Sequence, residues 1–188
     1  MAEGNDKANK HTIIALVADR PGVLNRIASL FRRRGFNIES LAVGHSEQPN
    51  LSRMTFVVDA GPGASEQVTK QLRKLIDVVK VSDISDEPVV AREMALIKVK
   101  ATPATRSEII QLVGIFRADI VDVAHESLII ETTGDEDKIE ALVRLLRPFG
   151  IREVMRTGRV AMLRGSAGAE EEEELRHRAN GGKPLETK

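Results

Sequence analysis

The chain has 188 residues, with 28 Lys and Arg against 28 Asp and Glu, so its formal net charge is zero. This length suits one or two small domains, and the balanced charge argues against a dedicated nucleic-acid or membrane-surface binder. Cys, Trp and Tyr are absent, which excludes disulfides and thiolate chemistry and leaves few aromatic rings for stacking on bases.

Polar segments are expected at both ends of the chain. The first ten residues, MAEGNDKANK, lack the apolar stretch of a signal peptide. The longest apolar run, residues 13–18, is far shorter than the roughly 20 residues that a membrane span needs. The C-terminal segment carries five consecutive Glu and a Gly-Gly-Lys-Pro stretch, a composition typical of disorder. We therefore expect a soluble, cytoplasmic protein.

In the first half, hydrophobic spacing predicts the order β-α-β-β-α-β, the ferredoxin-like unit. A β-rich run over residues 12–17 precedes a helix that ends at Gly35. A strand over residues 37–43, a strand with alternating apolar residues, a second helix and a strand over residues 78–84 follow. The predicted first helix face is Leu24, Ile27, Ala28 and Phe31, the alternating residues are Met54, Phe56 and Val58, and the second helix face is Val68, Leu72, Leu75 and Ile76.

The second half repeats this order after Glu87-Pro88, which we interpret as the boundary. Strands are predicted over residues 95–101, 120–124, 128–132 and 151–157, and an extension over 160–163 is left open. The helix faces are Ile109, Leu112, Val113 and Phe116, then Ile139, Leu142, Val143 and Leu146. The predicted fold class is therefore α/β (α+β), with two ferredoxin-like domains.

Catalytic chemistry has little support in the sequence. The four histidines, His11, His45, His125 and His177, are far apart and show no metal-ligand spacing. No nucleophile-elbow or P-loop motif occurs. Three Arg, residues 32–34, end the first helix, where cations stabilise the helix dipole; contact with an anion or RNA is the less favoured interpretation. We expect no catalytic residue, metal site or cofactor in this chain.

The junction between the first strand and the first helix is the most informative segment. Pro21 suits the first turn of a helix, and Gly22 leaves backbone N–H groups open to an approaching anion such as an α-carboxylate. Asp19, just before, can accept hydrogen bonds from an α-ammonium. An equally supported alternative is that Asp19 caps the helix and Gly22 only relieves crowding.

This junction also carries a family resemblance. Residues 19–24, DRPGVL, in a β-α-β-β-α-β unit resemble the ACT domain, an amino-acid-sensing regulatory module. The resemblance extends to the regulatory (small) subunit of acetolactate synthase, also called acetohydroxyacid synthase, and covers roughly residues 11–165. The matching segments are 34–43 (RGFNIESLAV), 51–55 (LSRMT), 71–78 (QLRKLIDV), 92–99 (REMALIKV) and 116–123 (FRADIVDV).

The resemblance implies a non-catalytic regulatory subunit in valine, leucine and isoleucine biosynthesis. Its partner is a large subunit that holds thiamine diphosphate, magnesium and FAD; the small subunit activates it and confers inhibition by valine or another branched-chain amino acid. In this family two ACT domains associate side by side and the effector binds at their interface. By position the effector residues are Asp19, Pro21, Gly22, Val23 and Leu24 of one chain, facing Asn37 and Ile38 of the other.

These expectations define four segments: a flexible N-terminal tail over 1–11, an ACT domain over 12–86, a C-terminal ferredoxin-like domain over 87–165 and an acidic flexible tail over 166–188. Expected partners are the catalytic subunit, a second copy of the chain and a small amino acid, with no nucleic acid and no membrane. The main alternative is a stand-alone ACT-domain amino-acid sensor that regulates another enzyme or a transcript. A small enzyme that uses the cleft of the second domain is a third hypothesis.

Overall fold

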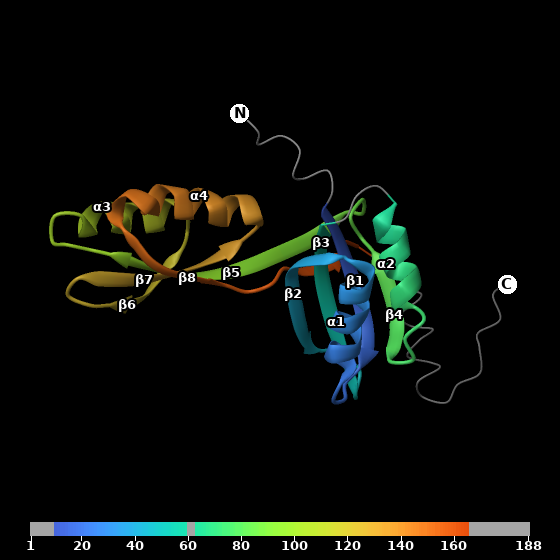
Figure 1. Ribbon diagram of the computed structural model, residues 1–188. Helices are drawn as coiled ribbons and strands as arrows, with labels where there is room; N and C mark the ends of the chain where they lie inside the picture. The colour runs from blue at the N-terminus through green and yellow to red at the C-terminus, as the bar shows by residue number, and fades with distance from the viewer. Residues whose placement is uncertain (1–9, 60–62, 166–188) are drawn as a thin grey trace. The chain divides into compact units, whose positions relative to one another are not determined.

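The structure is a computed structural model that describes residues 10–59 and 63–165 (Figure 1). The acidic tail predicted over 166–188 and most of the N-terminal tail lie outside these residues. The described chain forms two compact units. Unit 1 contains the described residues up to Val90 and those from Ala161 onward, and unit 2 is Ala91–Val160.

Unit 1 is a four-stranded antiparallel sheet with two helices on one face (Figure 1). The strand order is β2-β3-β1-β4, so β1 and β3 are central and β2 and β4 are the edges. This is the predicted ferredoxin-like arrangement, and the fold class is confirmed. Its elements are β1 (Lys10–Ala18), α1 (Val23–Arg34), β2 (Asn37–His45), β3 (Leu51–Asp59), α2 (Ala64–Leu72) and β4 (Val78–Asp83).

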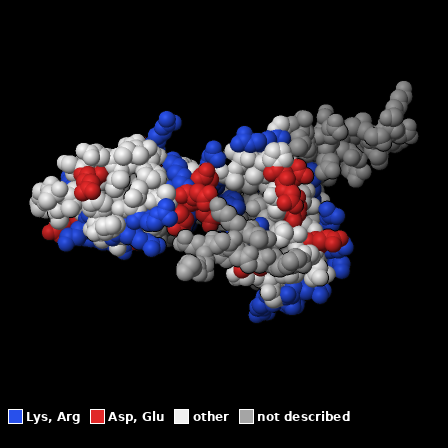
Figure 2. Space-filling model, turned by 90° about the horizontal axis from the view of Figure 1, so that it is seen from above, with Lys and Arg blue, Asp and Glu red and all other residues white. Residues whose placement is uncertain are grey.

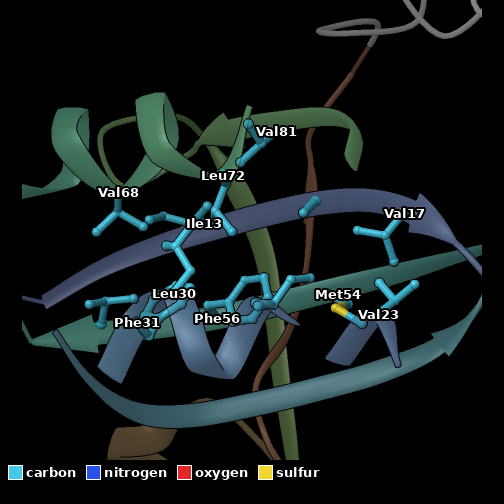
Figure 3. Packing of buried hydrophobic residues seen from close by; sticks show 13 residues of the cluster. Ile13, Val17, Val23, Leu30, Phe31, Met54, Phe56, Val68, Leu72 and Val81 are labelled. Carbon is cyan, nitrogen blue, oxygen red and sulfur yellow. The ribbon is translucent and has the colours of Figure 1, made fainter. Parts of the chain in front are cut away.

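The core of unit 1 lies between the sheet and the helices. Phe31 of α1 stacks on Phe56 of β3 with ring centroids 5.4 Å apart, and Val23 packs in the same cluster as Val17 and Met54 (Figure 3). Val23 thereby holds the first turn of α1 against the end of the sheet where β1 stops. Burial of this many large apolar side chains is the main stabilising contribution in a domain of this size.

The predicted face of α1 is partly wrong. Ile27 and Phe31 are buried as expected, but the other buried residues are Val23 and Leu30, while Leu24 is 46% exposed. Ala28 is also exposed. The helix is rotated relative to the prediction because Val23, not Leu24, is directed to the sheet.

The second helix of unit 1 is shorter than its apolar spacing predicts. Val68 and Leu72 are fully buried and Leu75 packs at the edge of the core, as predicted. The helix ends at Leu72, however, so Ile76 lies in the following turn and is 89% exposed. The prediction for Ile76 is wrong because helical periodicity does not continue past the last helical turn.

Unit 2 repeats the topology of unit 1. Its sheet has the order β6-β7-β5-β8, which is the order of unit 1 shifted by four strands, and β9 pairs with β5 beyond it. Both predicted helix faces are confirmed, with Leu112, Val143 and Phe116 partly buried and the others buried. The elements of unit 2 are β5 (Val89–Lys100, which begins at the end of unit 1), α3 (Arg106–Ile115), β6 (Asp119–Val123), β7 (Ser127–Gly134), α4 (Glu136–Leu146), a short 3-10 helix (Arg147–Phe149) and β8 (Ile151–Arg156). The partner of β5 outside this order, β9 (Val160–Leu163), falls mostly within unit 1.

The repeat extends to irregularities in the strands. Register shifts occur at Leu16/Val17 in the β1–β4 ladder and at Lys98/Val99 in the equivalent β5–β8 ladder. They also occur between Ile38 and Ser40 in unit 1 and at the matching place in β6. In the part of the chain that the structure describes, no helix is long and apolar enough to cross a bilayer.

Candidate functional site

The candidate site is the turn between β1 and α1. Gly22 is the residue directly before the helix and has φ 89° and ψ −10°, a left-handed conformation that L side chains rarely adopt. A Cβ placed on Gly22 meets no atom within 4 Å, so the space above the turn is open. Helix α1 has no side-chain cap, which makes the alternative that Asp19 caps it wrong.

The first turn of α1 has free hydrogen-bond donors. Val23 N–H approaches the carbonyl of Arg20 at 3.5 Å, and Arg26 N–H donates to the carbonyl of Gly22 at 3.0 Å. The N–H groups of Leu24 and Asn25 have no acceptor within residues 10–59 and 63–165. Free donors at the positive end of a helix dipole favour an anion such as a carboxylate.

Asp19 opens this turn, directly after the last residue of β1. Its backbone N–H donates to the carbonyl of Asn50 at 2.8 Å, which ties it to the β2–β3 loop. Its carboxylate Oδ2 is 3.0 Å from Nδ1 of His45, the last residue of β2, and its side chain remains 43% exposed. The Asp19 carboxylate is therefore open to a cationic group from solvent.

Two arginines share one buried carboxylate beneath the turn. Asp77, which directly precedes β4, is 2% exposed. Its Oδ1 accepts from Arg20 Nε at 2.8 Å and also from Arg20 Nη2, and its Oδ2 accepts from Arg26 Nη1 at 2.5 Å. Asp77 was not among the predicted site residues. It is 57 and 51 positions from its partners, and no local pattern signals such a pair.

The ion pairs also set the ionisation of Asp77. The hydrogen bond from Arg20 lowers the pKa of this carboxyl below its ordinary value of 3.8, against an opposing effect of burial, and Arg26 adds to the lowering. The pKa of Asp77 is lower in the folded protein than in the unfolded chain. The ion pairs therefore contribute their full stabilisation of the fold at pH values above the unfolded-state pKa. It is lost as the pH falls through the folded pKa.

This sign gives a first prediction for stability. Asp77→Asn should lower the free energy of unfolding by a constant amount from neutral pH down to about pH 5, and the difference from the parent should shrink below about pH 4. Urea unfolding of both proteins at several pH values measures it. A difference that grows on acidification would contradict the assignment of the ion pairs.

The other two predicted effector residues lie at the far end of the same sheet. Asn37 and Ile38 open β2, and Asn37 pairs with Asp59, which in turn pairs with Lys10 at the start of β1. The turn after Ala18 is eight residue steps away, about 26 Å at roughly 3.3 Å per residue. Asn37 is exposed, whereas Ile38 packs partly against the core. One chain therefore does not bring the two groups of residues together.

The equivalent turn of unit 2 has a different structure. Thr105 precedes α3 with φ −102°, and its hydroxyl accepts the N–H of Thr102 at 3.1 Å, which closes the turn. Ala104 stands where unit 1 has Gly22. Of the two equivalent turns, the one before α1 is therefore an open glycine turn and the one before α3 is not.

No group of three or more His, Asp or Glu is arranged to hold a metal ion in the described ranges, 10–59 and 63–165. On the face seen in Figure 2, acidic and basic side chains are interspersed over the described surface.

Both units match known protein families. The family model described as "AHAS small subunit-like ACT domain" matches residues 13–80, and "Small subunit of acetolactate synthase" matches residues 92–165. The chain is 59% identical over 157 residues to a probable acetolactate synthase small subunit of Archaeoglobus fulgidus, covering 84% of this chain and 98% of that one. It is 55% identical over 158 residues to the acetolactate synthase small subunit of Mycobacterium bovis, covering 84% and 94%.

A solved structure gives the same result. The crystal structure of the acetolactate synthase small subunit from Thermotoga maritima superposes with a TM-score of 0.77 at 46% identity. The match covers 83% of this chain and 98% of that one. It therefore includes both units, so the similarity is not confined to the turn at Gly22.

Proposed function

The chain belongs to the family of acetolactate synthase small subunits, and from this membership we propose that it activates the catalytic subunit and makes that subunit sensitive to valine. Regulation of branched-chain amino-acid biosynthesis follows from the family. The observation that carries the proposal is the match of both units to this one family, together with an open glycine turn in the ACT unit. The setting of this regulation is the cytoplasm.

The effector site has halves from two copies of the chain. Because Asp19 and Asn37 lie at opposite ends of one sheet, a second copy supplies the missing half. β2 is an edge strand of the sheet that the described residues form, and an edge strand can pair with a strand of another chain. An antiparallel pairing of two β2 strands about Leu41 places Asn37 of one copy opposite His45 of the other. His45 already contacts Asp19, so this pairing brings the two halves together twice per dimer.

The charges at the turn suit a free amino acid. The free N–H groups of Leu24 and Asn25 donate hydrogen bonds to an α-carboxylate, and the exposed carboxylate of Asp19 accepts hydrogen bonds from an α-ammonium. The side chain of the effector is apolar, since Leu24, in the first turn of α1, is an apolar residue that is 46% exposed. Valine combines these three features.

The catalytic subunit supplies the chemistry in this proposal. It is the thiamine-diphosphate-dependent partner that also holds magnesium and FAD, and this chain contributes neither a cofactor site nor a catalytic residue. The activating contact and the effector site are separate surfaces, so inhibition can be lost without loss of activation.

Reconstitution is the direct test and a second prediction. Purified chain mixed with its cognate catalytic subunit is expected to raise acetolactate formation above that of the catalytic subunit alone, and added valine is expected to reverse the increase. The chain alone should form no acetolactate. The stand-alone sensor would be established instead by two results together. The chain would leave acetolactate formation by the catalytic subunit unchanged, and a pull-down with the chain would recover a different enzyme or a transcript.

A further inference from the structure

Asp77 connects the candidate turn to the sheet through four hydrogen bonds from three residues. Its side chain accepts from Arg20 and Arg26, as described above. Its backbone carbonyl accepts the N–H of Ala18, the last residue of β1, at 2.8 Å. Arg20 and Ala18 precede Gly22 and Arg26 follows it, so one buried residue fixes the chain on both sides of the glycine.

The internal repeat shows that the fold does not require this arrangement. In unit 2 the N–H of Lys100 donates to the carbonyl of Gly150 at 2.9 Å, the equivalent of the bond from Ala18 to Asp77. Gly150 precedes β8 as Asp77 precedes β4. The position equivalent to Asp77 therefore has no side chain, yet the same sheet and the same register shift form there.

The ion pairs also set the charge beneath the turn. Two guanidinium groups and one carboxylate sum to +2 − 1 = +1. The two guanidinium side chains remain 54% exposed, whereas the carboxylate is buried. The two arginines, Arg20 and Arg26, flank the free N–H groups of α1 in the chain, and their surplus positive charge complements an incoming carboxylate.

We propose that Asp77 is a positioning residue of the effector site, which it serves by fixing the α1 N-terminal donors through Arg20 and Arg26. This inference rests on the function proposed above and deepens it. Asp77 itself does not contact the effector, because its carboxylate is buried and occupied by the two arginines.

Asp77→Asn separates positioning from charge because the two effects have opposite signs. The substitution raises the local charge from +1 to +2, which alone would strengthen carboxylate binding and lower the valine concentration needed for half inhibition. Loss of positioning weakens binding instead. We expect a rise of about tenfold in that concentration, equivalent to about 1.4 kcal/mol.

Glu93→Gln in unit 2 is the matched control. Glu93 is also a poorly exposed carboxylate shared by two arginines, with Arg156 Nη2 at 3.3 Å and Arg159 Nε at 3.5 Å. Each variant is mixed with the catalytic subunit, and inhibition is measured along a valine titration relative to the activity of that complex without valine. Glu93→Gln should shift the half-inhibition concentration by less than about twofold, well below the shift for Asp77→Asn.

A second variant covers the case in which Asp77→Asn does not fold. Arg20→Gln changes a half-exposed side chain and should shift the valine response in the same direction. The double variant should shift it no further than Asp77→Asn alone, because both changes remove the same link. An unchanged or lowered half-inhibition concentration in Asp77→Asn, or equal shifts in Asp77→Asn and Glu93→Gln, would overturn the inference.

The proposed function has its own separate indicator. If Gly22→Asp abolishes valine inhibition while neither Asp77→Asn nor Arg20→Gln changes it, the effector site stands and the positioning role is refuted. If Gly22→Asp also has no effect, the placement of the effector site itself is wrong, and the role of Asp77 is refuted with it.

Discussion

Gly22→Asp is expected to abolish inhibition by valine while leaving activation of the catalytic subunit largely intact. The added Cβ meets no atom within 4 Å, so the side chain projects into the open space where the effector carboxylate is expected. A like charge in a partly dry site costs several kcal/mol, which corresponds to about a hundredfold or more in affinity. The measurement is acetolactate formation by the reconstituted complex along a valine titration.

Gly22→Asn is the matched control for this variant. Gly22 has φ 89°, so any side chain there strains the backbone, and Asn is among the residues that tolerate this conformation best. Asn has nearly the same shape as Asp without the charge, so it separates electrostatic repulsion from strain. We expect Asn to weaken inhibition by about tenfold or less. An Asp variant that retains the parent inhibition curve would show that the effector does not bind at this turn.

Much of the fold was predictable because its signals are local. Alternation in β3, the helix faces of unit 2 and the left-handed Gly35 after α1 all follow from spacings within one element. The face of α1 was predicted less well because Leu24 and Val23 both continue the spacing set by Ile27 and Phe31. The turn at Gly22 directs Val23, and not Leu24, toward the sheet. Helical periodicity carries no information about the φ of Gly22.

The site was predictable only in part for a similar reason. The glycine turn is a local motif, and residues 19–22 form an open turn before α1, which begins at Val23. The support of that turn is not local, because Asp77 directly precedes β4, which is the neighbour of β1 in the sheet but lies far along the chain. His45 likewise reaches Asp19 only through the pairing of β2 with β3 and of β3 with β1. Such contacts require the sheet order, which strand patterns alone do not specify.

The largest effect on assembly is expected from Val43→Glu. Val43 lies on the edge strand β2 and is 49% exposed in the single chain, although it is apolar. In the proposed pairing of two copies through β2, this position is buried in each copy, so the substitution introduces two charges into one interface. Burial of an unpaired charge is costly, and we expect the dimer dissociation constant to rise by at least about a hundredfold.

Val79→Glu on the other edge strand, β4, tests whether the edge matters. Val79 is 45% exposed, so the two substitutions are closely matched in chemistry and in exposure. Sedimentation at micromolar concentration should find Val43→Glu as a monomer and Val79→Glu as a dimer like the parent. Because the proposed effector site combines Asp19 and Asn37 from different copies, the monomeric variant should also lose inhibition by valine. The opposite result, in which the Val43→Glu protein stays dimeric and valine-sensitive and the Val79→Glu protein is a monomer, would place the dimer interface at β4. An effector site built from the two ends of β2 would then be ruled out.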